Sequence, residues 1–189
     1  MAASDLDICN RALAMIGSDP ITSIDGTERA ADLCRRLYPQ LRDELTAAHP
    51  WNFATQRASL AASATAPGWE FTTAFPLPAD CLRVWKIQSW DPLDPWRVEA
   101  GSLVCNLTGP LNIQYIARVT DATQFAPGYV GALAARLAME LVLPLARSEA
   151  LREQMGQVHV MALRQAKAAD AQESNADRII ADVLVQARY

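Results

Sequence analysis

The sequence predicts a mainly α fold, with a four-helix core, a small antiparallel β insertion and a C-terminal tail. Apolar side chains recur at steps of three and four in four segments, two before residue 66 and two after residue 118. Six of the eleven prolines lie between Pro67 and Pro110, where short β-prone runs separate them. A length of 189 residues with 51% hydrophobic residues suits one domain with its own core.

The N-terminal part, residues 1–65, is predicted to supply two helices of the core, over 4–17 and 27–48. Each helix is preceded by a capping-box pattern, in which a small polar residue is followed three positions later by an acid. The residues of the two patterns are Ser4 with Asp7 and Asp25 with Glu28. Pro50 ends the second helix, because a proline disfavours the helical conformation of the residue before it.

The β insertion is predicted over residues 66–118. Four runs have strand character, and Glu99–Ser102 inside the third reads as a hairpin turn with Gly101. The runs cover 69–75, 82–90, 96–106 and 111–119. A short antiparallel sheet is therefore expected between the two helical parts.

Residues 119–173 are predicted to return as two core helices, over 127–147 and 149–173. The first carries a stripe of leucines widened by alanines, which is typical of close helix packing. Ser148 is positioned to cap the second. Residues 174–189 form a tail whose apolar side chains have no partner in the predicted core.

Composition narrows the function classes. The net charge is −4 and no basic block is present, which disfavours a dedicated nucleic-acid-binding protein. The sequence predicts no membrane span, and the acidic N-terminus lacks a signal-peptide pattern, so we expect synthesis in a reducing cytoplasm. The four cysteines are widely spaced, so neither a disulfide framework nor a zinc site is expected. Cys9 and Cys34 are predicted to be small buried residues.

The sequence contains none of the common catalytic or nucleotide-binding motifs and only two histidines. We therefore predict no catalytic, metal-binding or cofactor-binding residues. Two other classes remain open. Asp91, Asp94 and Glu70 lie near tryptophans, as in a glycan-cleaving cleft, although Asp-Pro is also an ordinary turn. The first two helices can imitate a helix-turn-helix DNA-binding unit, but their connection is long and contains a proline.

Two large aromatic residues follow directly behind the end of the second helix, in His49-Pro50-Trp51-Asn52-Phe53. Aromatic side chains bury large areas and fix geometry, so we predict a packed structural corner. The residues assigned to it are Tyr38, Pro50, Trp51 and Phe53. The alternative is an exposed patch that joins neighbouring subunits.

Two runs carry a resemblance to a known family. One contains Tyr38-Pro39, Arg42-Asp43 and His49 to Ala54, and the other is Leu77-Pro78-Ala79-Asp80-Cys81-Leu82-Arg83-Val84. Over roughly residues 5–173 the chain resembles the tail tubular protein A family, the head-to-tail adaptors (connectors) of short-tailed bacteriophages.

The resemblance implies a structural protein of the virion neck. Such adaptors form a ring, typically of twelve subunits, under the portal ring, where they extend the channel for double-stranded DNA and offer a platform to the distal tail (nozzle) protein. The resemblance also implies a C-terminal segment that docks into the portal. In this sequence its contact residues would be Ile179, Ile180, Val183, Leu184, Arg188 and Tyr189.

Overall fold

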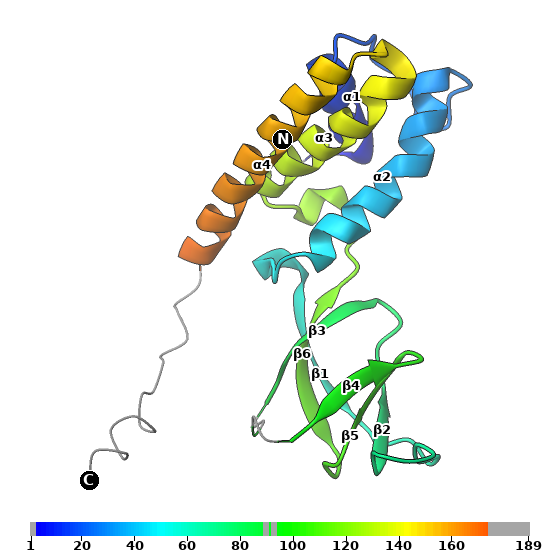
Figure 1. Cartoon of the computed structure of the whole chain (residues 1–189), viewed down its shortest axis with the longest axis vertical. Coiled ribbons are helices and arrows are strands. Elements are labelled where there is room, and N and C mark those ends of the chain that lie inside the picture. Colours follow the sequence, from blue (N-terminus) through cyan, green and yellow to red (C-terminus); the bar gives the residue numbers. More distant parts are fainter. Residues whose placement is uncertain (1–2, 89–90, 92–93, 174–189) are drawn as a thin grey trace.

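In the computed structural model, which describes residues 3–88, 91 and 94–173, the chain has a helical part and a β part at opposite ends (Figure 1). The helices are α1 (Asp5–Met15), α2 (Arg29–Ala47), α3 (Pro127–Leu141) and α4 (Glu149–Gln172). The strands are β1 (Thr55–Leu60), β2 (Thr73–Pro76), β3 (Cys81–Ile87), β4 (Trp96–Glu99), β5 (Ser102–Cys105) and β6 (Leu111–Ala117).

The prediction of a mainly α fold with a small insertion is wrong. The helices make up 48% of the chain and the strands 19%, and the strands form two separate three-stranded antiparallel sheets. The β part also has a hydrophobic core of its own, built around Phe75, Leu103 and Ile113. The fold is therefore mixed, with one core in each part.

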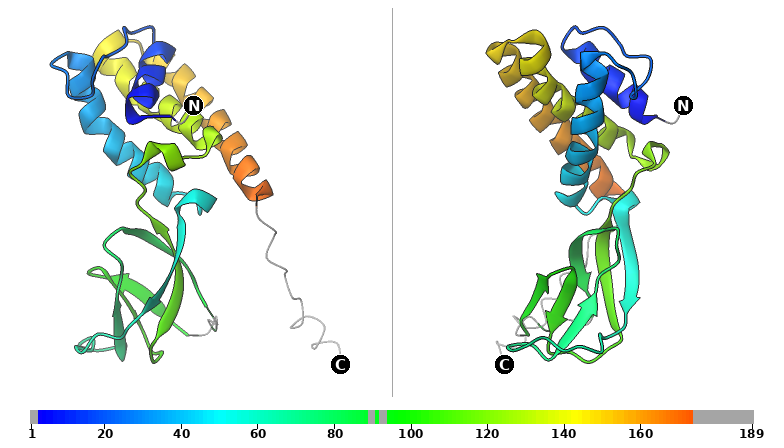
Figure 2. Two further views of the ribbon diagram at one scale, coloured as in Figure 1. Left: turned by 180° about the vertical axis from the view of Figure 1, so that it is seen from behind. Right: turned by 90° about the vertical axis from the view of Figure 1, so that its right-hand side faces the viewer.

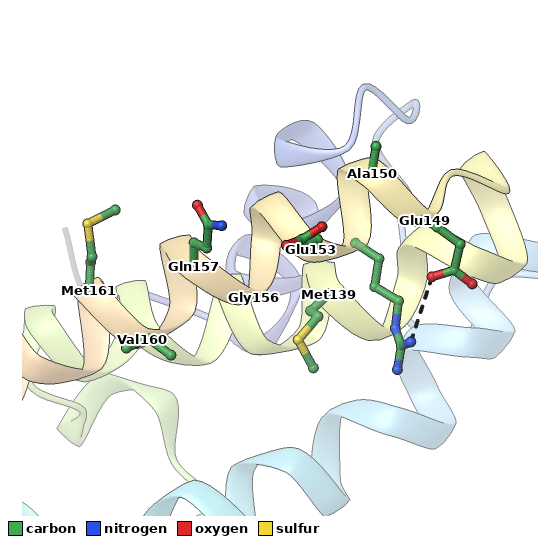
Figure 3. Close-up of a pocket in the computed structure, with 9 residues that line it drawn as sticks. Met139, Glu149, Ala150, Glu153, Gly156, Gln157, Val160 and Met161 are labelled. Carbon is green, nitrogen blue, oxygen red and sulfur yellow. Dashed lines mark ion pairs between the residues drawn. The ribbon is translucent and has the colours of Figure 1, made fainter.

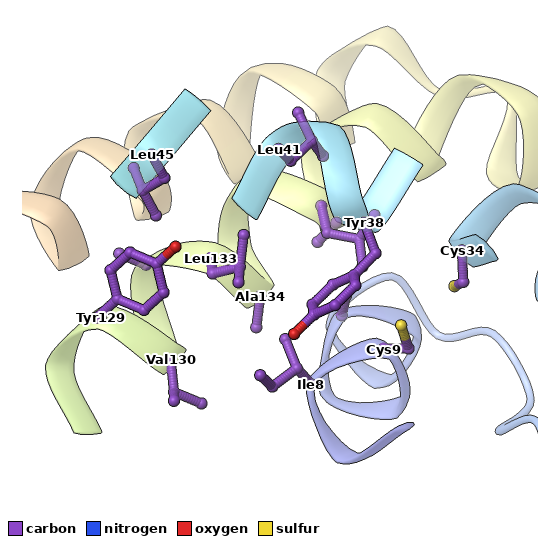
Figure 4. Close-up of a cluster of buried hydrophobic side chains, with 14 of the residues drawn as sticks. Ile8, Cys9, Cys34, Tyr38, Leu41, Leu45, Tyr129, Val130, Leu133 and Ala134 are labelled. Carbon is purple, nitrogen blue, oxygen red and sulfur yellow. The ribbon is translucent and has the colours of Figure 1, made fainter. Parts of the chain in front are cut away.

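Helix α3 is the centre of the helical part and packs against α1, α2 and α4. Its leucines and alanines are almost all buried, as their spacing predicts. Figure 4 shows Leu133 and Ala134 facing side chains from α1 and α2. Gly128 allows α3 to approach α4 closely, because a Cβ atom there would lie 3.0 Å from the Cα of Ala166 in α4. Cys9 and Cys34 are buried in this core, which confirms their prediction.

Two of the three predicted N-terminal helix caps are confirmed. Ser4 and Asp7 form the predicted capping box, and the Ser148 hydroxyl accepts from the Leu151 N–H. The predicted cap of α2 is wrong, because that helix starts after Glu28 without a side-chain cap. A π-helical segment over Val142–Ala146 carries the chain from α3 towards α4.

The two sheets of the β part have strand orders β1-β6-β3 and β2-β5-β4. They lie in two layers, as the side view of Figure 2 shows. The hairpin turn after Glu99 is as predicted, with Ala100 and Gly101 at positive φ. Strand β1 starts at Thr55, ahead of the expected insertion, and pairs with β6 from Thr55–Ile116 to Leu60–Leu111.

By length and composition alone, the helix Pro127–Ala146 would be able to cross a membrane. More than half of that window, 56%, is buried inside the protein, as expected of a central core helix. The helix is therefore weak evidence for a membrane protein.

Candidate functional site

The two sequence runs that carry the resemblance come together where the helical part meets the β part. After α2 the chain turns through a short 3₁₀ segment, Asn52–Ala54, into β1. We call this region the junction. It holds an aromatic cluster, a buried carboxylate and a network of ion pairs, and it borders a pocket in the β part.

The aromatic cluster consists of Trp51, Phe53, Phe125 and Tyr129. Trp51 is fully buried, and its indole Nε1–H donates to the Leu45 carbonyl at 3.0 Å. Its ring lies 5.1 Å from that of Tyr129 in an edge-to-face arrangement. Phe53 packs in turn on Tyr129 and Phe125, at 4.9 and 5.5 Å. The aromatic residues behind Pro50 thus fasten the end of α2 to the start of α3.

Polar groups inside this cluster are satisfied. The Tyr129 hydroxyl donates to the Arg42 carbonyl at 2.9 Å and lies 2.7 Å from the Thr46 hydroxyl. Burial raises the pKa of the Tyr129 hydroxyl above its usual value. This hydroxyl therefore stays protonated and acts as a fixed hydrogen-bonding group.

Tyr38 does not belong to this corner, although the sequence grouped it there. Its ring is buried against α1 in the helical core, and its hydroxyl donates to Asp5 Oδ1 at 2.7 Å. It shares helix α2 with the corner, but it holds α1 rather than the junction. Pro50 is half-buried at the end of α2, and the Trp51 N–H bridges it by donating to the His49 carbonyl at 2.9 Å.

The buried carboxylate is Asp170, in the last turn of α4, and sequence reasoning missed it. The backbone N–H of Asn52 donates to Asp170 Oδ1 at 3.0 Å, and the Asn52 amide donates to the Asp170 carbonyl at 2.7 Å. His49 Nε2 lies 3.4 Å from Asp170 Oδ2. Burial lowers the pKa of His49, although the charge of Asp170 opposes this shift. The last turn of α4 is therefore tied to the junction.

Ion pairs connect α2 to the β part. Asp43 accepts from Arg42 at 2.8 Å and from Arg118 at 2.7 Å. The backbone N–H of Arg118 donates to the Asp80 carbonyl at 2.7 Å, and Asp80 Oδ1 accepts from the Tyr115 hydroxyl at 3.3 Å. Arg118, just after β6, thus links both resemblance runs.

A pocket of about 460 Å³ opens beside β3, and its walls come largely from the run 77–84. Apolar side chains dominate the lining, which is completed by Trp96 and Val98 of β4 and by Gly101. Arg83 is the one charged residue among those lining it. No sequence motif pointed to this pocket as a binding site.

A larger open groove, about 890 Å³, runs along the outer face of α4 (Figure 3). Met139 of α3 and the exposed side chains of Val160 and Met161 form its apolar part. Glu149 and Arg152 pair at its other end, at 3.9 Å.

The three carboxylates of the glycan-cleaving hypothesis line neither the pocket beside β3 nor the groove along α4. Glu70 pairs with Arg97 at 3.1 Å, and the Asp94 N–H donates to the Asp91 carbonyl at 3.0 Å. Trp69, beside Glu70, is 81% exposed. Within the described part of the chain no group of three His, Cys, Asp or Glu is arranged to hold a metal ion. The predicted portal-docking residues, from Ile179 to Tyr189, lie outside the described residues.

Comparison with known proteins gives no assignment. No protein-family model matches the chain, and no curated protein matches it.

Proposed function

We propose that the chain is a structural head-to-tail adaptor of a bacteriophage. In this role copies of the chain form a ring under the portal, typically of twelve, which continues the DNA channel and gives the distal tail protein a platform. The proposal requires no catalytic activity.

The observation that carries the proposal is the convergence of the two resemblance runs. The run ending at Ala54 builds the aromatic cluster, and the run Leu77–Val84 builds the start of β3 and the pocket wall. Arg118 joins them through Asp43 and Asp80. Nearly every polar group described at this junction forms a hydrogen bond or ion pair with another segment of the chain. Such contacts suit a protein that keeps a fixed shape within an assembly.

Two further features support the proposal. Helix α4 is anchored at its last turn by Asp170, so the helix end that precedes residues 174–189 in the sequence is held in place. A peptide that leaves a rigid helix end is well placed to add its apolar side chains to a groove on another protein. The net charge of −4 per chain also disfavours adhesion of DNA to a ring of such subunits, since basic surfaces gain affinity by releasing counterions.

The test is binding of the purified chain to the portal ring encoded in the same genome. Full-length protein is compared with a truncation after Glu173, which leaves every described element intact. Binding by the full chain and loss of binding by the truncation support the adaptor and assign docking to the C-terminal segment. Binding by both forms would still support the adaptor, but would place the portal contact within residues 1–173. Failure of both forms to bind contradicts the proposal.

A further inference from the structure

The groove along α4 exposes apolar surface that no described part of the chain covers. Val160 and Met161 are 46% and 57% exposed, and the half-buried Met139 of α3 lies beside them (Figure 3). Methionine adapts its shape to a partner and is enriched at protein interfaces. An apolar groove rimmed by charged side chains is typical of a contact with another protein chain.

The charged rim of the groove lies at the start of α4 and is acidic. It consists of Glu149, Arg152 and Glu153, with a net charge of −2 + 1 = −1. Glu149 pairs with Arg152 at 3.9 Å, whereas Glu153 is exposed and forms no ion pair with a described residue. The Glu153 carboxylate is therefore open to a cation from a partner.

The outer face of α2 carries the opposite charge. Arg29, Arg35 and Arg36 are exposed in the first eight residues of this helix, and Asp32 pairs with the last two of them. The net charge of these four residues is +3 − 1 = +2. One turn further on, Pro39 is exposed as well. We call the three arginines and Pro39 the α2 face.

The two helices are arranged so that one copy of the chain can contact the next. Helix α3 lies between α2 and α4, and both outer helices begin at the end of the helical part that is remote from the β part (Figures 1 and 2). Each of the two helices carries its charged residues near that end, and the apolar residues follow. A rotation about an axis along the length of the molecule preserves these directions. It therefore brings the arginines of one copy beside Glu153 of another.

The apolar residues match in the same arrangement. Pro39 and the aliphatic stems of the arginines can cover Val160 and Met161, because arginine buries its stem along apolar surface while its guanidinium stays polar. A symmetric contact between two α4 grooves would instead bring like charges together at Glu153, which is unfavourable. The charges thus favour a head-to-tail contact, in which each copy offers one surface and receives the other.

We propose that the α4 groove binds the α2 face of a second copy of the chain, with Arg36 donating to the Glu153 carboxylate and the arginine stems and Pro39 covering Val160 and Met161. The inference rests on the adaptor proposal in that it names the contact between neighbouring subunits of the ring. Repeated from copy to copy, a head-to-tail contact closes a ring when the rotation fits.

The test is self-association of the full chain in the absence of any portal protein, followed by sedimentation velocity. The wild-type chain should associate with a Kd of about 1 mM or tighter for a single contact. Met161→Asp in the groove and Arg36→Glu on the α2 face should each weaken this association at least about ten-fold. Both positions are exposed, so both variants should melt at the wild-type temperature.

A mixture of the two variants tests the head-to-tail geometry. The Arg36→Glu chain keeps an intact groove and the Met161→Asp chain keeps an intact α2 face, so an equimolar mixture should form heterodimers and nothing larger. Val98→Asp and Arg57→Glu change exposed residues of the β part, outside the groove and the α2 face, and are the matched controls. Both controls should associate like the wild type.

A wild-type chain that stays monomeric at about 1 mM would overturn the proposal, and so would a mixture that stays monomeric. Loss of association in Met161→Asp but not in Arg36→Glu would indicate a symmetric contact through α4 and would also overturn it. The outcome is separate from the portal test. Self-association without portal binding would contradict the adaptor alone, whereas portal binding by a chain that stays monomeric in solution would contradict this contact alone.

Discussion

The carboxylate of Asp170 accepts the backbone N–H of Asn52 at 3.0 Å, although 118 positions separate these residues in the sequence. This contact fixes the last turn of α4 to the turn between the helical part and β1. A carboxylate at the C-terminal end of a helix is opposed by the helix dipole, so the Asp170 carboxylate depends on the Asn52 backbone N–H and on His49 beside it.

Replacement of Asp170 should therefore destabilise the protein. Asp170→Ala removes the charged side-chain acceptor of the Asn52 N–H, a partly buried hydrogen bond, at a cost of about 1–3 kcal/mol in the free energy of unfolding. Urea denaturation measures this change. Glu173→Ala, an exposed acid at the same helix end, is the control and should change stability by less than about 0.5 kcal/mol. Equal effects of the two substitutions would show that the contact contributes nothing specific.

Trp51 should be among the most sensitive positions of the chain. Trp51→Ala leaves a cavity at a fully buried site and removes the hydrogen bond to the Leu45 carbonyl. The free energy of unfolding should therefore fall by about 3–5 kcal/mol. Trp69→Ala, at an 81% exposed position, should have almost no effect. Thermal and urea unfolding of both variants provide the comparison. If Trp51→Ala were as stable as the wild type, the corner behind Pro50 would not be part of the packed core.

Stability should fall as the pH is lowered below about 6.5. Burial lowers the pKa of both His49 and His159 below the ordinary value of 6.5, so the unfolded chain binds more protons between the folded and the unfolded pKa. Stability contributed by the neutral imidazoles is fully present above pH 6.5 and is lost as the pH falls through this window. A pH series of urea unfolding measures the slope.

His49→Gln should make that slope shallower, and so should His159→Gln. If the ion pair with Asp170 outweighed burial at His49, the sign would reverse, and stability contributed by this residue would increase on acidification. Such a result would contradict the assignment of burial as the dominant cause.

Two helical glycines should respond in opposite directions to the same substitution. In Gly128→Ala the new Cβ would lie 3.0 Å from the Ala166 Cα, so α3 and α4 must move apart and the protein should lose about 1–3 kcal/mol. In Gly156→Ala the nearest atom is the Met139 sulfur at 3.5 Å, an ordinary contact. That variant should gain up to about 1 kcal/mol from helix propensity. Destabilisation of similar size in both would argue against the close approach of α3 and α4 at Gly128.

The helices were predictable because their buried apolar residues recur at helical spacing, in a stripe on α2 and over most of the surface of the central helix α3. Strand β1 was missed because 55–60 reads Thr-Gln-Arg-Ala-Ser-Leu, with little intrinsic strand preference. It is a strand because β6 provides its partner over the whole register. The size of the β part was underestimated for the same reason.

The junction was only half visible in the sequence. Trp51 and Phe53 stood out by their size and their position behind Pro50. Asp170 did not, since it forms no motif with its sequence neighbours. Asp170 matters because of its contact with Asn52, 118 positions away in the sequence. Such roles arise from tertiary contacts and leave no local signal.

The central claim is the ring under the portal, and the mass of the complex tests it most directly. Native mass spectrometry of portal rings mixed with an excess of the full chain should show a gain of about 247 kDa, twelve times the 20.6 kDa of one chain. A gain that corresponds to a closed ring of another size would support the adaptor proposal with a different number of subunits. No gain in mass, with both components shown to be folded, would contradict the account.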